Sequence, residues 1–183
     1  MPPSRSTPQN LILIGFMGTG KSSIGRLLAA RLRFKFVDTD QIIVESAGME
    51  IPEIFAKPGE PHFRDLETEA LRTLASVQRR VVATGGGIVI REENRPLLQA
   101  LGLVVALTAT DEVIFKRVSR NKKRPLLQTP NPRETIARLL GTREPLYAET
   151  AQRLVDTSDL THAEVAEVII GEAREAFSWE SAG

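Results

Sequence analysis

The stretch NLILIGFMGTGKSSIGRLLA, residues 10–29, joins an apolar run, a glycine-rich turn and the start of an amphipathic pattern. The apolar run, 10–15, lacks polar alternation, which is typical of a strand buried on both faces. The turn, 15–22, matches G-x-x-x-x-G-K-[ST] between a predicted strand and a predicted helix. Small residues there let backbone N–H groups point at a phosphate, and the helix N-terminus favours its negative charge. The stretch predicts a nucleotide-phosphate site; the alternative is a plain turn before an ordinary helix.

The same pattern assigns roles to individual side chains. Lys21 is expected to bridge the β- and γ-phosphates of a purine triphosphate, and the Ser22 hydroxyl to bind Mg²⁺. A GTPase would also need N-K-x-D for guanine, but residues 121–124 read NKKR, with Arg124 in place of the aspartate. The pattern therefore favours a transferase over a GTPase switch. The predicted nucleotide-binding residues of the loop are Gly18, Thr19, Gly20, Lys21, Ser22 and Ser23.

Strand-like and helix-like segments alternate along the rest of the chain. This alternation predicts an α/β fold of three αβα layers, with a five-stranded parallel sheet flanked by helices. Between the second strand, which we expect to be buried, and the third, the pattern indicates two helices. Because no linker or repeat divides the chain, we expect one domain over 1–183. The predicted strands are 10–15, 34–40, 81–84, 103–109 and 153–157.

Two segments stand outside this alternation. The opening MPPSRSTPQN is polar and proline-rich, and residues 1–9 are expected to be a disordered tail. The segment 119–131 is rich in Pro, Asn and Lys and follows neither a helical nor a strand period. Connections of that length in a compact domain are usually functional lids or disordered. We expect a lid there.

Composition excludes several classes of function. The 183 residues carry a net charge of +1, which provides no general attraction to polyanions. With no cysteine and two histidines, a disulfide framework is excluded and little remains for thiolate or imidazole metal binding. No apolar run approaches the roughly 20 residues of a membrane span, and the N-terminus lacks the apolar core of a signal peptide. We expect a cytoplasmic protein.

Three unusual segments follow predicted strands: the phosphate loop, DTD at 38–40 and TGGG at 84–87. In parallel sheets, ligands bind at the carboxyl ends of the strands. Asp38 and Asp40 could hold a water on Mg²⁺ and accept a hydrogen bond from an acceptor hydroxyl, or they could simply cap the next helix. The glycines could form a turn, a close helix–strand crossing or a surface against which a ligand lies.

Single arginines in this chain are unremarkable, but the motifs that contain them form a pattern. The segments LIGFMGTGKSSIGRLLA, VDTD, an IFA…GE…FR…E run, ATGGG, RPLL and REPLYAE closely resemble the shikimate kinases in order and spacing, from Asn10 to about Ile170. The resemblance implies a P-loop NTPase fold with a lid, of the nucleoside-monophosphate-kinase-like branch. It implies transfer of the ATP γ-phosphoryl group to the 3-hydroxyl of shikimate, in the pathway to chorismate and the aromatic amino acids.

The resemblance also implies the partners and the acceptor site. ATP, Mg²⁺ and shikimate are the implied ligands of a kinase that leans towards monomers, and the region 34–62 with the following helix would bind the substrate. Asp40 would hold the shikimate hydroxyls and be the candidate base. Arg64 and Arg143 would clamp the carboxylate, which a guanidinium matches bidentately. The backbone amides of Gly86 and Gly87 would face the ring, where a β-carbon would occupy the substrate's space, and Gly85 would belong to the same substrate-binding turn.

Further roles follow from the same resemblance. Asp38 would act on the water shell of Mg²⁺, Arg117 would lie beside the adenine, and Arg124 on the lid would close onto the phosphates. The implied catalytic residues are Lys21, Asp40 and Arg124. Phe55, Phe63 and Glu67 match positions that line or brace the pocket, although core packing explains the two phenylalanines nearly as well.

Two rival functions remain open from the sequence. A related kinase acting on gluconate or a nucleotide would share the phosphate loop and the lid, but Arg64 and Arg143 together with TGGG argue against it. The second rival is a non-catalytic nucleotide-binding or nucleic-acid-binding module that uses the basic residues 122–124. The net charge near zero, and the lack of aromatic residues interleaved with that patch, disfavour this second rival.

Overall fold

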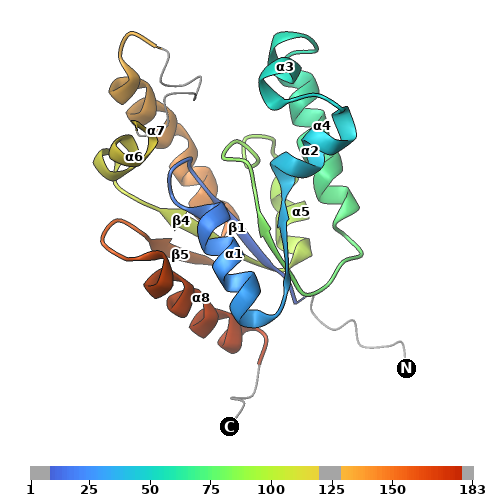
Figure 1. Ribbon diagram of the computed structural model, residues 1–183, viewed down its shortest axis with the longest axis vertical. Helices are drawn as coiled ribbons and strands as arrows, with labels where there is room; N and C mark the ends of the chain where they lie inside the picture. The colour runs from blue at the N-terminus through green and yellow to red at the C-terminus, as the bar shows by residue number, and fades with distance from the viewer. Residues whose placement is uncertain (1–8, 120–128, 179–183) are drawn as a thin grey trace.

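The computed structural model describes residues 9–119 and 129–178 of the chain (Figure 1). Within these residues, each strand is followed by one or more helices. The strands are β1 Leu11–Gly15, β2 Lys35–Asp38, β3 Arg80–Ala83, β4 Leu103–Thr108 and β5 Arg153–Asp156. The helices are α1 Lys21–Leu32, α2 Thr39–Ala47, α3 Ile51–Ala56, α4 Glu60–Thr73, α5 Asn94–Leu101, α6 Asp111–Ser119, α7 Pro132–Thr150 and α8 His162–Ala176.

The sheet has β1 at its centre. All neighbouring strands pair in parallel, in the order β2-β3-β1-β4-β5. Leu13 of β1 lies opposite Ala83 of β3 and Val105 of β4. Because parallel strands end at the same edge, the phosphate loop after β1 lies near the segments that follow β2 and β3. The predicted five-stranded parallel sheet is confirmed.

Helices cover both faces of this sheet, as the alternation along β1 shows (Figure 1). Ile12 and Ile14 face the core that α5, α6 and α7 complete, whereas Leu11 and Leu13 face the core shared with α1 and α8. Successive side chains of a strand point to opposite faces, so a continuous apolar run can supply both cores. All four side chains are fully buried. The three αβα layers are therefore confirmed.

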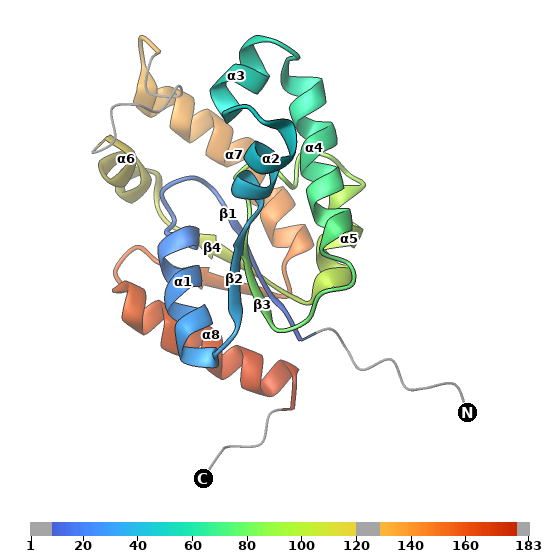
Figure 2. The same ribbon diagram turned by 45° about the vertical axis from the view of Figure 1, so that its right-hand side comes forward.

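Helices α2, α3 and α4 form an arm that projects beyond the sheet (Figures 1 and 2). This α2–α4 arm has a small core of its own, built from Ile43, Ile54, Phe63 and Ala70. The sequence predicted two helices here and missed α3. A helix of six residues is too short to show a period, although Pro52 in its first turn is a common helix start.

The prediction that the second strand is buried is wrong. β2 is an edge strand, in which Lys35 is exposed and the other three residues are only partly buried. The apolar residues that suggested burial contact the cores on both faces but are only partly covered: Val37 packs on one core and Phe36 on the other. The Phe36 ring centre lies 4.4 Å from the guanidinium of Arg26. A short apolar run does not distinguish an edge strand from a central one, because strand order is a property of the whole sheet.

Candidate active site

The phosphate loop leaves β1 and enters α1 in a conformation that requires its glycines. Gly18 and Gly20 have φ angles of 81° and 95°, in the left-handed region that strains other residues. Lys21 begins α1 and is buried, and its Nζ donates to the carbonyls of Gly15 at 2.7 Å and Phe16 at 2.9 Å. The ammonium group is therefore anchored to the loop backbone, inside the turn of chain where the pattern predicts phosphate.

Two other residues of the predicted loop set differ in what they offer a ligand. The Thr19 hydroxyl donates to the Phe16 carbonyl at 2.8 Å, and Thr19 is 1% exposed. Its side chain braces the loop, so only its backbone can meet a phosphate. Ser23 is exposed and lines the cavity described below.

Asp38 joins the phosphate loop to the α2–α4 arm. Its Oδ2 accepts a hydrogen bond from the Ser22 hydroxyl at 3.1 Å, and its Oδ1 accepts one from the Asp40 N–H at 3.1 Å. The second bond caps α2, which is the structural alternative considered for this residue. The two oxygens of this carboxylate face different elements, so capping α2 leaves the predicted role at Mg²⁺ open to the other oxygen. The contact with Ser22 places a hydroxyl and a carboxylate side by side at the predicted Mg²⁺ position.

A cavity of about 470 Å³ lies at the carboxyl ends of the central strands. Its walls come from the phosphate loop, the end of β2, the glycine turn after β3, α6 and the start of α8. One space therefore connects the predicted phosphate-binding residues with Asp40 and the glycine turn. The cavity is lined by Met17, Gly18, Gly20, Lys21, Ser22, Ser23, Asp38, Asp40, Thr84, Gly85, Gly86, Arg117 and His162.

Arg117 and His162 also line this cavity, although both lie far from the phosphate loop in the sequence. Arg117 donates to the carbonyl of Gly18 at 3.3 Å and to the carbonyl of Thr157 at 2.6 Å, which ties the phosphate loop to the segment after β5. His162, the first residue of α8, lies with its Nε2 3.4 Å from where a β-carbon on Gly20 would stand. The sequence analysis did not predict a role for His162, because only the tertiary structure brings α8 to the loop.

The glycine turn, residues 84–87, is held by hydrogen bonds from separate elements. The Gly85 N–H donates to the Thr39 hydroxyl at 3.1 Å, and the Gly86 carbonyl accepts from the Tyr147 hydroxyl of α7 at 2.5 Å. Within the described residues, the N–H groups of Gly86 and Gly87 donate no hydrogen bond to the protein. Backbone donors without a protein acceptor beside a cavity are suited to a ligand. Tyr147 was not predicted as a site residue, although it lies one helical turn after Arg143.

The reason for the glycines is partly different from the prediction. A β-carbon on Gly85 would lie 2.7 Å from Asp40 Oδ1, and one on Gly87 would overlap the guanidinium of Arg64. At both positions the space is therefore filled by side chains of the site itself, and not by substrate alone. A β-carbon on Gly86 would meet only ordinary contacts at 3.5 Å, so its predicted role against a ligand stays a prediction.

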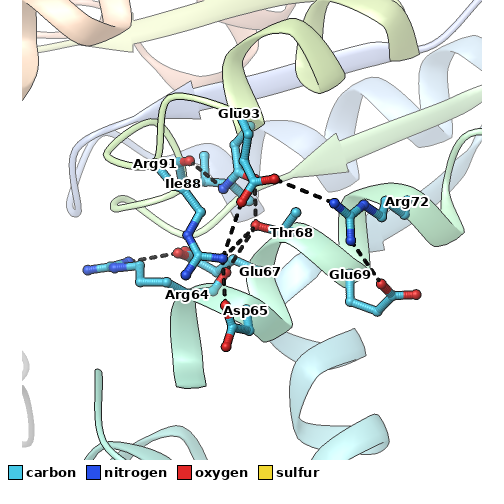
Figure 3. A network of polar contacts seen from close by, with 10 residues as sticks. Arg64, Asp65, Glu67, Thr68, Glu69, Arg72, Ile88, Arg91 and Glu93 are labelled. Atoms are coloured by element: carbon cyan, nitrogen blue, oxygen red, sulfur yellow. Dashed lines mark hydrogen bonds and ion pairs between the residues drawn. The ribbon is translucent and has the colours of Figure 1, made fainter. Parts of the chain in front are cut away.

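Arg64 and Glu67 form an ion pair on one face of α4 (Figure 3). Arg64 Nη1 donates to Glu67 Oε2 at 2.7 Å, and Nη2 donates to Glu60 at 2.7 Å. The Arg64 side chain is 12% exposed, whereas that of Glu67 is 1% exposed. Within the described residues, Arg64 Nε and Glu67 Oε1 are buried without a hydrogen-bond partner. Both atoms keep hydrogen-bonding capacity that a polar ligand could use.

Burial and mutual charge shift the pKa values of this cluster. Burial raises the pKa of Glu67 above its ordinary 4.5, the nearby carboxylate of Asp40 raises it further, and the ion pair with Arg64 opposes both effects. Burial also raises the pKa of Tyr147 to about 12, against the lowering effect of Arg143 and Arg64. Since both arginines act on the same phenol, the fold brings together two residues that are far apart in the sequence.

Arg143 reaches this cluster from α7. Its guanidinium lies 5.6 Å from the centre of the Phe16 ring, and its charge partly opposes the rise of the Glu67 pKa. Arg64 and Arg143 therefore approach one region from α4 and α7, with the glycine turn between these helices. The two guanidinium groups lie in a cluster that also contains the carboxylates of Glu67, Glu60 and Asp40. Within this cluster the arginines are the groups whose geometry matches an anionic ligand.

The two predicted phenylalanines, Phe55 and Phe63, are not among the residues that line the cavity. Phe63 is buried in the core of the α2–α4 arm, while Phe55 is exposed, with the two ring centres 4.7 Å apart. Core packing thus accounts for Phe63. Arg124 and residues 120–128 of the predicted 119–131 lid lie outside the described residues, as do residues 1–8 of the predicted tail.

Comparison with known proteins identifies the family. The family model described as shikimate kinase matches residues 17–174. The shikimate kinase of Geobacter metallireducens is 54% identical over 144 residues, which cover 79% of this chain and 80% of that protein. The chain belongs to the shikimate kinase family. It is therefore an ATP-dependent kinase that acts on a hydroxyl group of shikimate, as the sequence predicted.

Solved structures agree with this assignment. The shikimate kinase from Acinetobacter baumannii in complex with shikimate has a TM-score of 0.87 and 39% sequence identity, covering 93% of this chain and 95% of that chain. A gluconokinase from Sinorhizobium meliloti has a TM-score of 0.61 at 22% identity, covering 95% of this chain and 97% of that chain. The likeness to the gluconokinase shows a shared fold alone.

Replacing Glu67 by glutamine is expected to make stability less dependent on pH. Because the folded-state pKa of Glu67 is raised, its ionised form weakens the fold as the pH rises above 4.5, and glutamine cannot ionise. The free energy of unfolding of Glu67→Gln, relative to wild type, should therefore increase from about pH 5 to about pH 8. Urea unfolding across this range measures it. A difference that falls with pH would contradict the raised pKa.

Replacing Gly87 by alanine is expected to weaken shikimate use selectively. Two ion pairs hold Arg64 where the new β-carbon would stand, so the guanidinium must move. The KM for shikimate should rise about tenfold or more, with the KM for ATP within about twofold, since a small misplacement of a binding group is enough for such an effect. Gly141→Ala on α7, where a β-carbon meets nothing within 4 Å, is the control. An unchanged shikimate KM in Gly87→Ala would refute the explanation.

Proposed function

We propose that this chain transfers the γ-phosphoryl group of ATP to the 3-hydroxyl of shikimate, in the route to chorismate. The observation that supports this most directly is that a single cavity is lined both by Lys21 and Ser22 of the phosphate loop and by Asp40 and Gly85. A nucleotide on the loop and an acceptor against the glycine turn would therefore meet in one space. Phosphoryl transfer depends mainly on such positioning and on charge stabilisation.

In this proposal the arginine pair binds the shikimate carboxylate. Arg64 and Arg143 approach from different helices, and a planar guanidinium binds a carboxylate through two parallel hydrogen bonds. Arg64 Nε is buried and has no acceptor among the described residues, so a carboxylate oxygen could take that bond. The complex of the Acinetobacter baumannii relative with shikimate supports this choice of ligand.

Asp40 is the proposed partner of the reacting hydroxyl. In the transfer, the acceptor oxygen forms a bond to the γ-phosphorus, the bond from that phosphorus to the bridging oxygen of ADP breaks, and the hydroxyl proton must leave. Asp40 lines the cavity beside Gly85 and can accept that proton or orient the hydroxyl. Lys21 would balance the charge on the phosphates during the transfer.

Ser22 and Asp38 are the proposed residues for Mg²⁺. Their hydroxyl and carboxylate oxygens lie 3.1 Å apart on the cavity wall, and Mg²⁺ prefers oxygen ligands. Among the described residues no group of three or more His, Cys, Asp or Glu could hold a metal ion. This fits an ion held by few side chains together with phosphate oxygens and water. When bound, Mg²⁺ neutralises charge on the transferred group.

Location and assembly belong to the same proposal. Among the helices of residues 9–119 and 129–178, none is long and apolar enough to cross a membrane. We propose a cytoplasmic monomer that binds small molecules and not nucleic acid. A steep loss of affinity for nucleic acid with rising salt would instead reveal an electrostatic nucleic-acid binder.

The acceptor is tested by ADP release from ATP and Mg²⁺ with shikimate, gluconate and nucleoside monophosphates as separate acceptors. Turnover is expected with shikimate alone. Lys21→Ala is the matched negative control, because Nζ serves the loop and the phosphates, and its turnover should fall by about a hundredfold or more. Turnover with gluconate in place of shikimate would overturn the proposed acceptor, and wild-type turnover in Lys21→Ala would overturn the role of the loop.

Arg143→Lys is expected to retain the positive charge and lose most of the clamp. A lysine is a point charge and cannot form two parallel hydrogen bonds to a carboxylate. The shikimate KM should rise at least about tenfold, while the KM for ATP stays within about twofold. Steady-state kinetics with each substrate varied in turn separates the two constants. Unchanged affinity for shikimate would remove Arg143 from the proposed clamp.

A further inference from the structure

α4 extends from the core of the α2–α4 arm into the core on the α5–α7 face of the sheet. Phe63, near the start of α4, belongs to the core of the arm. Leu71, near its end, belongs to the core between the sheet and α5, α6 and α7. Thr68 lies between them, 2% exposed, and faces Asn94, the first residue of α5, which is 0% exposed. Two fully buried polar side chains therefore meet where the arm ends, and both need hydrogen-bond partners.

The hydrogen bonds of Asn94 determine which group donates and which accepts in its contact with Thr68. Asn94 Nδ2 donates to the carbonyl of Ile88 at 2.9 Å, so Oδ1 faces the Thr68 hydroxyl at 2.8 Å. That hydroxyl also lies 3.1 Å from the Arg64 carbonyl, but it has a single proton, and the shorter contact with Asn94 takes it. Arg91 donates to the Thr68 oxygen at 3.4 Å (Figure 3). A continuous chain of hydrogen bonds thus runs from α4 to the backbone of Ile88.

The two ends of this chain lie next to the acceptor site. Thr68 follows Glu67 directly and lies one helical turn after Arg64, while Ile88 follows Gly87 directly. Arg64 passes through the space that a β-carbon on Gly87 would fill. The fit between helix and turn is therefore tight, and a binding group must be held within roughly 0.5 Å of its working position.

We propose that Thr68 and Asn94 are positioning residues for shikimate binding. By fixing α4 against the glycine turn, they place the Arg64 guanidinium where it meets the substrate carboxylate, although neither side chain belongs to the set that lines the cavity. The inference rests on the proposed function, because it assumes that Arg64 binds that carboxylate. An apolar pair of the same shape could be nearly as stable, so the hydrogen bonds contribute orientation more than stability.

Thr68→Val tests the inference, because valine keeps the shape of threonine and removes the hydroxyl. The KM for shikimate is expected to rise about tenfold, with the KM for ATP unchanged within about twofold, since only the acceptor side is displaced. Thr68→Ser retains the hydroxyl and should restore the wild-type KM within about twofold. Thr73→Val is the matched control on the same helix, because that hydroxyl donates to Ala70 at 2.7 Å and not to α5.

A neutral acceptor separates positioning from a general loss of structure. Shikimate methyl ester lacks the charge that Arg64 would bind, so its KM should change less than about twofold between wild type and Thr68→Val. If wild type does not prefer shikimate to its ester, the proposed carboxylate clamp fails. If wild type prefers shikimate and Thr68→Val keeps that preference with a normal KM, the positioning inference alone is refuted.

A second pair of variants covers a failure of Thr68→Val to fold. Thr68→Ala and Thr68→Ser differ by a single oxygen atom, and alanine is the better helix former. The inference expects the shikimate KM of Thr68→Ala to exceed that of Thr68→Ser by about tenfold. Equal values in these two variants, or an equal rise in the KM for ATP, would overturn it.

Discussion

The parallel pairing of β1 with β3 is the constraint on which the site depends. It sets Leu13 opposite Ala83, so the phosphate loop and the glycine turn leave the sheet side by side. β2 pairs with β3 on the far side and brings Asp38 and Asp40 to the same edge. No single element contains the site. It exists because three strands end together, each followed by a segment with a different chemical function.

The charges of the acceptor side are arranged for binding at the expense of stability. A carboxylate as buried as Glu67 is costly to ionise, and its raised pKa records that cost. Arg64 offsets part of it through the ion pair, and Arg143 adds a second positive charge from α7. Glu60 and Asp40 bring further carboxylates close to this pair, so charges of both signs are crowded into one region. Buried charges with shifted pKa values are typical of functional sites, where binding has been favoured over the most stable packing.

The glycine turn adjoins both the phosphate loop and the proposed acceptor site, and hydrogen bonds from several elements hold it in place. Its backbone is held by Thr39 from the arm and by Tyr147 from α7, and Asn94 of α5 holds the carbonyl of Ile88 directly after it. Each anchor comes from an element that also carries, or packs against, a proposed substrate-binding residue. A turn fixed at several points can position a substrate, because small shifts in any one element meet resistance from the others.

The sequence by itself determined the alternation of strands and helices, the phosphate loop and the family, because these depend on local patterns of apolar residues, glycine and charge. It also indicated Asp40, Arg64 and Arg143 as a set, through resemblance. Only the tertiary structure decided that β2 lies at an edge, that Gly87 makes room for Arg64, and that His162, Tyr147 and Asn94 adjoin the site. The physical reason is that these features depend on which elements pack together, and contacts between distant segments leave no periodic trace in the chain.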